Sequence, residues 1–202
     1  MNLHDFMKQA IRTESRIEEF SAPRELLEGA LEAYIAAGNM LDQIKKNTFY
    51  GSDFNLPKYK HTMEQLSWHL VKSSQRLYDQ LRLTDRTGDL NNILDTTYEA
   101  VEPRTAHALI GMTTESTEIA ESFLNYLRTG NVDIVNVFEE TSDFQWYVAL
   151  LVDEYNIDPY QPLENVINKL KARYPEKFTQ EQAENRNLEV EREVLSTNLK
   201  DV

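Results

Sequence analysis

The chain of 202 residues contains no cysteine, and it has only 6 glycines and 6 prolines. Without cysteine there can be no disulfide framework, no thiolate zinc site and no cysteine nucleophile. Basic residues are also scarce, because 21 lysines and arginines stand against 34 aspartates and glutamates, for a net charge of -13. A chain this acidic lacks the basic face that binding to duplex nucleic acid requires, so we expect no nucleic-acid partner.

Long hydrophobic runs are missing as well. No stretch approaches the roughly 18 apolar residues of a membrane-spanning helix, and no basic segment followed by an apolar stretch opens the chain. We therefore expect a cytoplasmic protein without a membrane partner. The hydrophobic content of 41% is adequate for the core of one sizeable domain or of two small ones.

The spacing of apolar residues predicts an all-α fold. Apolar residues recur every three or four positions, and leucine, glutamate, lysine and glutamine are abundant. The most turn-like stretch covers residues 84–89, so we place a domain boundary there, between domains 1–90 and 91–202. The expected helices cover about 3–17, 24–46, 59–83, 91–101, 103–128, 135–155, 159–173 and, in the charged tail, 181–195.

The two halves share a weak pattern of apolar residues. The two tryptophans, Trp68 and Trp146, are 78 residues apart, and the same offset superposes Leu66 on Phe144. An offset of 79 superposes apolar residues further upstream. The pattern fits a tandem duplication, and it also fits two unrelated helical hairpins.

Two acidic pairs stand out in the second half. Glu115 with Glu118 and Glu140 with Asp143 are spaced i, i+3, which places both carboxylates of a pair on one helix face. This spacing recurs elsewhere in the chain, but here apolar residues surround the acids, and an antiparallel hairpin would bring all four together. Converging carboxylates repel one another unless cations neutralise them, and hard oxygen ligands favour Mg²⁺ or Mn²⁺. A solvated acidic face is the alternative.

Other catalytic patterns are missing. A di-iron carboxylate bundle requires Glu-x-x-His on each of two helices, and none of the 4 histidines follows an acidic residue at that spacing. The sequence also has no His-Glu-x-x-His motif, no Gly-x-Ser-x-Gly motif, no glycine loop for phosphate and no dinucleotide-binding fingerprint. We therefore do not expect nucleophilic catalysis.

A cationic cluster follows the acidic pairs. Lys169 and Arg173 are spaced i, i+4 on one face of an expected helix. Near a metal site they could bind phosphate oxygens, the arginine through two parallel hydrogen bonds and the lysine as a point charge. Alternatively, they are the basic residues that the dipole of a helix favours at its C-terminus.

Residues 103–195 resemble the MazG-like all-α nucleoside triphosphate pyrophosphohydrolases, which are related to the dimeric dUTPases. The metal motif of that family is Glu-x-x-Glu, a spacer and Glu-x-x-Asp, and this chain has Glu115 and Glu118, 21 residues (119–139), then Glu140 and Asp143. The segments that accompany the motif are 107–111, 143–147, 169–178 and 185–192. Thr117 stands where the family commonly has glycine.

The resemblance implies a helical bundle and a Mg²⁺-dependent hydrolase, in which Mn²⁺ can substitute. Such an enzyme cleaves a nucleoside triphosphate between its α- and β-phosphates, giving a monophosphate and pyrophosphate. The implied catalytic residues and metal ligands are Glu115, Glu118, Glu140 and Asp143, and the implied substrate-binding residues are Lys169, Arg173, Tyr174 and Trp146. Trp146 at a helical spacing is also compatible with a place in the core.

The first half also resembles a copy of the family, through residues 12–15 and 38–51. The repeat offsets place Ala36, Asn39, Thr62 and Gln65 where the four acidic ligands stand. We therefore expect a degenerate repeat over residues 1–90 without metal ligands and a catalytic repeat over 91–202, forming a pseudo-dimer that could pair into a homodimer. The alternative function is a non-catalytic scaffold or regulator that retains the fold and a metal site.

Overall fold

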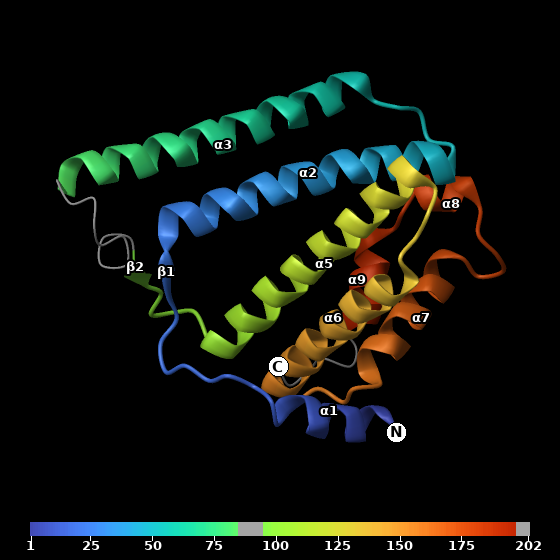
Figure 1. The fold of residues 1–202 in the computed structure, drawn as a ribbon. Coiled ribbons are helices and arrows are strands. Elements are labelled where there is room, and N and C mark those ends of the chain that lie inside the picture. The colour runs from blue at the N-terminus through green and yellow to red at the C-terminus, as the bar shows by residue number, and fades with distance from the viewer. Residues whose placement is uncertain (85–94, 197–202) are drawn as a thin grey trace. The chain divides into compact units, whose positions relative to one another are not determined.

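The computed structural model describes residues 1–84 and 95–196, and this part of the chain is predominantly helical, which confirms the all-α prediction (Figure 1). A short antiparallel ladder of two strands accompanies the helices. The helices are α1 (Leu3–Ile11), α2 (Arg24–Tyr50), α3 (Leu56–Thr84), α5 (Pro103–Thr129), α6 (Ile134–Glu154), α7 (Gln161–Arg173), α8 (Gln180–Glu184) and α9 (Leu188–Ser196), and the strands are β1 (Ser21–Pro23) and β2 (Asp95–Thr97).

Three expected helices were wrong in part. The helix expected over 181–195 is instead two helices, α8 and α9, with residues 185–187 between them. The described part of the helix expected over 91–101 contains β2 instead, because pairing with β1 from Ser21↔Thr97 to Pro23↔Asp95 overrides the local helix signal. The helix expected to reach residue 17 ends at Ile11. Just beyond that end, the hydroxyl of Thr13 donates to the carbonyl of Ala10 at 2.8 Å, a local bond that competes with helix continuation.

The chain forms two compact units that interleave along the sequence. Unit 1 comprises Met1–Phe20, Glu99–Ala172 and the chain from Leu188 onward, and unit 2 comprises Ser21–Tyr98 and Arg173–Asn187. The first 20 residues therefore pack with the second half of the chain, whereas the sequence predicted a single boundary between residues 90 and 91. That boundary lies outside the described residues. The tandem duplication and the homodimer stay predictions.

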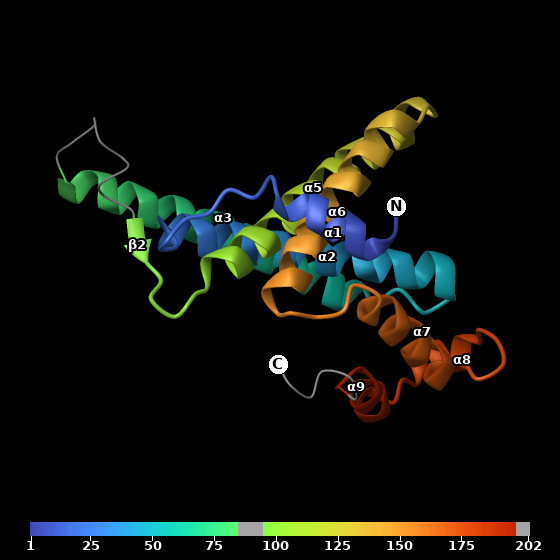
Figure 2. The ribbon, with the colours of Figure 1, turned by 90° about the horizontal axis from the view of Figure 1, so that it is seen from below.

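The hairpin of α5 and α6 is the centre of unit 1, and its two helices run side by side (Figures 1 and 2). The Glu102 carboxylate caps α5 by accepting from the backbone N–H of Thr105, and Gly130 ends this helix in the left-handed conformation at φ 71°. Asp133 then caps α6. Small residues such as Ala108 and Ala149 are buried along the hairpin, so the two helices can approach closely.

Unit 2 contains the hairpin of α2 and α3. Ala36 on α2 and Thr62 on α3 are buried, and the Thr62 hydroxyl donates to the carbonyl of Lys58 at 3.0 Å, within its own helix. Both belong to the four positions that the repeat offsets align with the acidic motif. Among the described helices, none combines the length and the apolar character that crossing a membrane requires.

Candidate metal centre

The acidic motif converges between α5 and α6. One carboxylate oxygen from each of Glu115, Glu140 and Asp143 lies within 4.8 Å of the others, a spacing that can hold one metal ion. Glu115 and Glu140 are buried, and Asp143 is exposed. Glu118, one helical turn beyond Glu115, is exposed, and its charge and hydrogen bonding act on the carboxyl group of Glu140. The structure thus brings three predicted ligands together and places the fourth close to one of them.

The carboxylates of this cluster disfavour one another's negative charge because they lie close together. Burial raises the pKa of Glu140 to about 7, and the charges and hydrogen bonds of Glu118 and Glu115 contribute in the same direction. Within residues 1–84 and 95–196, no lysine or arginine forms an ion pair with Glu115, Glu140 or Asp143. The cluster therefore needs either a bound proton or a cation to relieve the repulsion.

A cavity of about 380 Å³ adjoins the acidic cluster. This volume falls within the range typical of small-molecule sites, roughly 300–1,000 Å³. The residues that line it share unit 1 and are Thr13, Ser15, His107, Glu115, Asp143, Trp146 and Tyr147. Two of the three clustered acids thus face a space that also has aromatic walls.

The aromatic side of the cavity is tightly packed. The His107 ring contacts Trp146 and Tyr147 edge-on, with ring centroids 5.8 and 5.5 Å apart. Gly111 on α5 is buried, and a Cβ atom there would lie 2.1 Å from Cε1 of Tyr147, so the ring occupies space that only glycine leaves free. Burial and the negative charges of Glu115 and nearby acids raise the pKa of the Tyr147 hydroxyl. Tyr147 therefore stays protonated beside the cluster.

Trp146 connects the site to the N-terminal part of the chain. Its indole Nε1 donates to the carbonyl of Ala10 and to the hydroxyl of Thr13, both at 3.0 Å. These bonds bring Thr13 and Ser15 to the cavity of the acidic cluster. The sequence interpretation had assigned residues 12–15 to a first-half repeat and therefore missed them as part of this site. Residues 12–15 carry part of the resemblance of the first half to the family. No local sequence pattern shows that they pack against helices of the second half.

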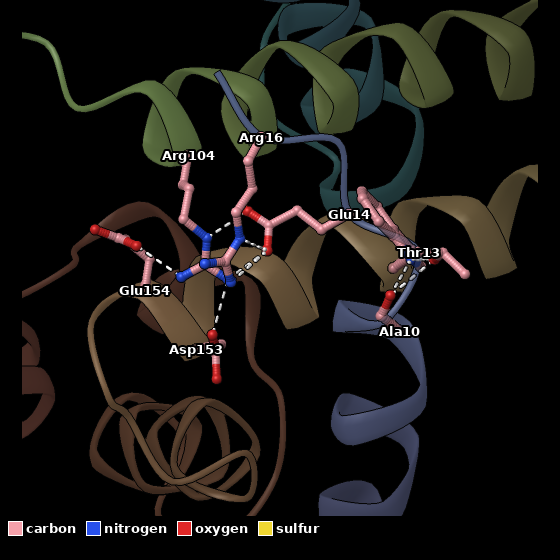
Figure 3. Close-up of polar contacts among 8 residues, drawn as sticks. Ala10, Thr13, Glu14, Arg16, Arg104, Asp153 and Glu154 are labelled. Atoms are coloured by element: carbon pink, nitrogen blue, oxygen red, sulfur yellow. Dashed lines mark hydrogen bonds and ion pairs between the residues drawn. The ribbon is translucent and has the colours of Figure 1, made fainter. Parts of the chain in front are cut away.

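A cluster of ion pairs around Arg104 includes residues 14 and 16 of the N-terminal part of the chain (Figure 3). The sequence did not predict this cluster. The cluster consists of Glu14, Arg16, Arg104, Asp153 and Glu154. Burial of Glu14 acts to raise the pKa of its carboxyl, but the hydrogen bonds and charges of Arg104 and Arg16 outweigh this effect and lower that pKa below its ordinary value. The hydrogen bond to Glu14 is the main cause of the raised pKa of Arg104. Glu14 and Arg104 are therefore both charged at neutral pH.

The predicted phosphate-binding residues are not placed at the cavity. Lys169 lies on α7 in unit 1 and is not among the residues that line the cavity, whereas Arg173 and Tyr174 belong to unit 2. The Arg173 guanidinium lies 5.6 Å from the centroid of the Tyr174 ring. Their role toward a substrate stays a prediction.

No protein-family model, no curated protein and no solved structure matches the chain. The converging donors are all carboxylate oxygens, which suit hard divalent cations such as Mg²⁺ and Mn²⁺ rather than soft metals.

Proposed function

We propose that this protein is a Mg²⁺-dependent nucleoside triphosphate pyrophosphohydrolase that converts (d)NTPs to (d)NMPs and pyrophosphate. The observation that carries the proposal is the convergence of Glu115, Glu140 and Asp143 between α5 and α6, beside a cavity with an aromatic wall. The reaction class comes from the resemblance of the acidic motif and its flanking segments to the MazG-like family.

The donor set fits a divalent cation. Three carboxylates meet at one place, two of them buried, and burial together with the charges of Glu118 and Glu115 raises the pKa of Glu140. A divalent cation would neutralise this cluster. Asp143 is exposed and lines the cavity, so a cation held there would be accessible to a phosphate group. Mg²⁺ commonly binds through a few carboxylates together with substrate phosphates and water.

Bound Mg²⁺ would supply Lewis-acid stabilisation of the phosphate oxygens and a water of lowered pKa. Glu115, Glu140 and Asp143 would hold it, and Glu118, which is exposed next to Glu140, is the carboxylate available to orient the attacking water. The aromatic wall suits the base, and we propose that Trp146 contacts it through the ring. Lys169, Arg173 and Tyr174 would bind the remainder of the substrate, the two cations neutralising polyphosphate charge.

The direct test is incubation of the purified protein with Mg²⁺ and a panel of NTPs and dNTPs, with separation of the products. We expect equal amounts of monophosphate and pyrophosphate and no diphosphate. Glu140→Gln should abolish turnover while the helical circular dichroism spectrum is unchanged. Glu139→Gln is the matched control, because the neighbouring Glu139 is exposed and lies outside the cluster. Full activity of Glu140→Gln would overturn the metal-ligand assignment.

Thermal melting, together with the product assay, separates the enzyme from the scaffold function. A scaffold that keeps a structural metal should be stabilised by Mg²⁺ in thermal melting but should neither cleave any nucleotide nor gain stability from a non-hydrolysable one. We expect the opposite result, in which Mg²⁺ and the nucleotide analogue together raise the melting temperature above the value with Mg²⁺ alone.

A further inference from the structure

Arg104, on α5, connects the N-terminal segment, residues 12–16, to the end of α6 through hydrogen bonds (Figure 3). Its guanidinium donates from Nε and Nη2 to the two carboxylate oxygens of Glu14, at 2.5 and 3.0 Å. It also donates to Glu154 at 2.7 Å and to Asp153 at 2.8 Å, both at the end of α6. One side chain at the start of α5 thus joins three parts of unit 1.

These contacts are shielded from water. The Glu14 side chain is 1% exposed and that of Arg104 is 17% exposed. A buried carboxylate without a partner is strongly unfavourable, so Glu14 depends on its two arginine neighbours. Arg104 contacts both of its carboxylate oxygens, whereas Arg16 contacts Oε2. Lysine cannot reproduce the planar geometry that reaches Glu14, Asp153 and Glu154 at once.

Glu14 lies between two residues of the cavity. Thr13 precedes it and Ser15 follows it, and both line the space next to Glu115 and Asp143. Trp146 already holds the segment at Thr13, and the Arg104 cluster holds it at the next residue. Arg104 itself is not among the residues that line this cavity, although it lines an adjoining one of about 260 Å³ together with Ser15.

We propose that Arg104 is a positioning residue of the nucleotide site, which acts by holding Glu14 so that Thr13 and Ser15 form part of the cavity wall. The inference rests on the proposed function. Apart from the carboxylates of Glu115 and Asp143, the described lining of this cavity consists of hydroxyl and aromatic groups and has no lysine or arginine. Thr13 and Ser15 therefore suit the uncharged nucleoside part of the substrate. Loss of Arg104 should therefore weaken nucleotide binding and leave the metal ligands in place.

The test compares the steady-state kinetics of Arg104→Met, Arg104→Lys and the control Arg128→Met, which removes an exposed arginine elsewhere on α5. For Arg104→Met we expect KM for the nucleotide to rise about tenfold or more, while kcat stays within about threefold. Arg104→Lys should recover only part of the affinity, and Arg128→Met should match the wild type. The shift in melting temperature on adding Mg²⁺ without nucleotide should be the same in all four proteins.

The double variant Glu14→Gln/Arg104→Met is a control for misfolding of Arg104→Met. It removes the buried carboxylate together with Arg104, so no buried charge loses its partner. It should fold and still show the raised KM, since the contact that holds the segment is missing. An unchanged KM in both Arg104→Met and the double variant would overturn the inference. So would a fall in kcat that accompanies loss of the Mg²⁺ effect, because the change would then be a general structural one.

Hydrogen exchange separates this inference from the proposed function. If the wild type cleaves no nucleotide, the proposed function fails, but exchange of the amides in residues 12–16 still reports on the contact that Arg104 makes. Faster exchange there in the double variant, with the amides around Glu115 and Glu140 unchanged, supports the positioning role. Unchanged exchange in residues 12–16 overturns it.

Discussion

The two long hairpins bury corresponding positions with opposite chemistry. At the offsets of 78 and 79 found in the sequence, buried Glu115 and Glu140 of α5 and α6 correspond to Ala36 and Thr62 of α2 and α3, which are buried as well. The remaining motif positions are exposed in both hairpins. Small neutral side chains can therefore fill the buried positions between the two helices of a hairpin. Helix packing does not require the carboxylates found at these positions in α5 and α6. Their presence indicates a function.

A second correspondence concerns the contact between the helices of each hairpin. In α5 and α6, the ring of Tyr147 lies against Gly111. The same offsets lead to Glu32 and His69 in α2 and α3, where the imidazole Nδ1 lies 2.7 Å from the carboxylate. The helices of one hairpin thus meet at a polar pair, and those of the other meet where an aromatic ring lies on a glycine. The second arrangement forms a wall of the cavity beside the acidic cluster.

The largest effect should come from giving α5 and α6 the residues of the other hairpin. In the double variant Glu115→Ala/Glu140→Thr, we expect turnover to fall by about 1,000-fold or more, because the metal ligands are lost. The fold should persist, since alanine and threonine occupy the corresponding buried positions of α2 and α3. Assays of pyrophosphate release and Mg²⁺-dependent melting check both points. Retained Mg²⁺ stabilisation would show that the ion binds elsewhere.

The pH dependence of stability should also distinguish the hairpins. The pKa of Glu140 is raised to about 7 in the folded protein, above its unfolded value, so its contribution to stability is full below about pH 4.5 and is lost as the pH rises through 7. Without metal, Glu140→Gln should therefore unfold at higher urea concentration than the wild type at pH 8, with the difference shrinking toward pH 5. Equal midpoints at pH 8 would contradict the assignment.

Gly111→Ala should have a smaller effect, confined to the aromatic wall. The added methyl group collides with the Tyr147 ring, and we expect a loss of about 1–3 kcal/mol in the free energy of unfolding together with a higher KM. Gly38→Ala is the matched control, because a Cβ atom at this α2 position meets nothing within 4 Å. That change should stabilise the helix by about 0.5–1 kcal/mol. Urea unfolding measures both.

The smallest effect belongs to the polar pair of α2 and α3. Glu32→Gln should change the free energy of unfolding by less than about 1 kcal/mol, because half-exposed ion pairs contribute little. It should leave nucleotide turnover and Mg²⁺ stabilisation untouched. A fall in turnover comparable to that of Gly111→Ala would show that the pair at Glu32 and His69 also supports the active site.

Local sequence signals predicted most of the helices and the place of the acidic cluster. The helix from Pro103 and the one before Tyr155 follow from caps and apolar spacing, both of which act within a few residues. The spacing of Glu115, Glu118, Glu140 and Asp143 predicted one helix face for each pair, and the short turn made convergence possible. These features depend on contacts between near neighbours in the chain.

Long-range contacts could not be predicted in the same way. Glu14 and Arg104 are 90 positions apart, and no periodicity relates them, so their pairing becomes visible only in three dimensions. The strand at 95–97 exists through its pairing with residues 21–23, which tertiary structure imposes on a segment expected to be helical. The contacts of residues 12–15 with α5 and α6 were missed for the same reason.

The interleaving of the units has a consequence for the order of folding during synthesis. The hairpin of α2 and α3 is formed by contacts between neighbouring segments, so it can assemble as soon as residue 84 has left the ribosome. The first 20 residues emerge earlier, yet Trp146, Asp153 and Glu154 exist only after most of the chain has been made. Residues 1–20 are thus synthesised before the hairpin of α2 and α3 but reach their contacts in unit 1 only after α6 has been made.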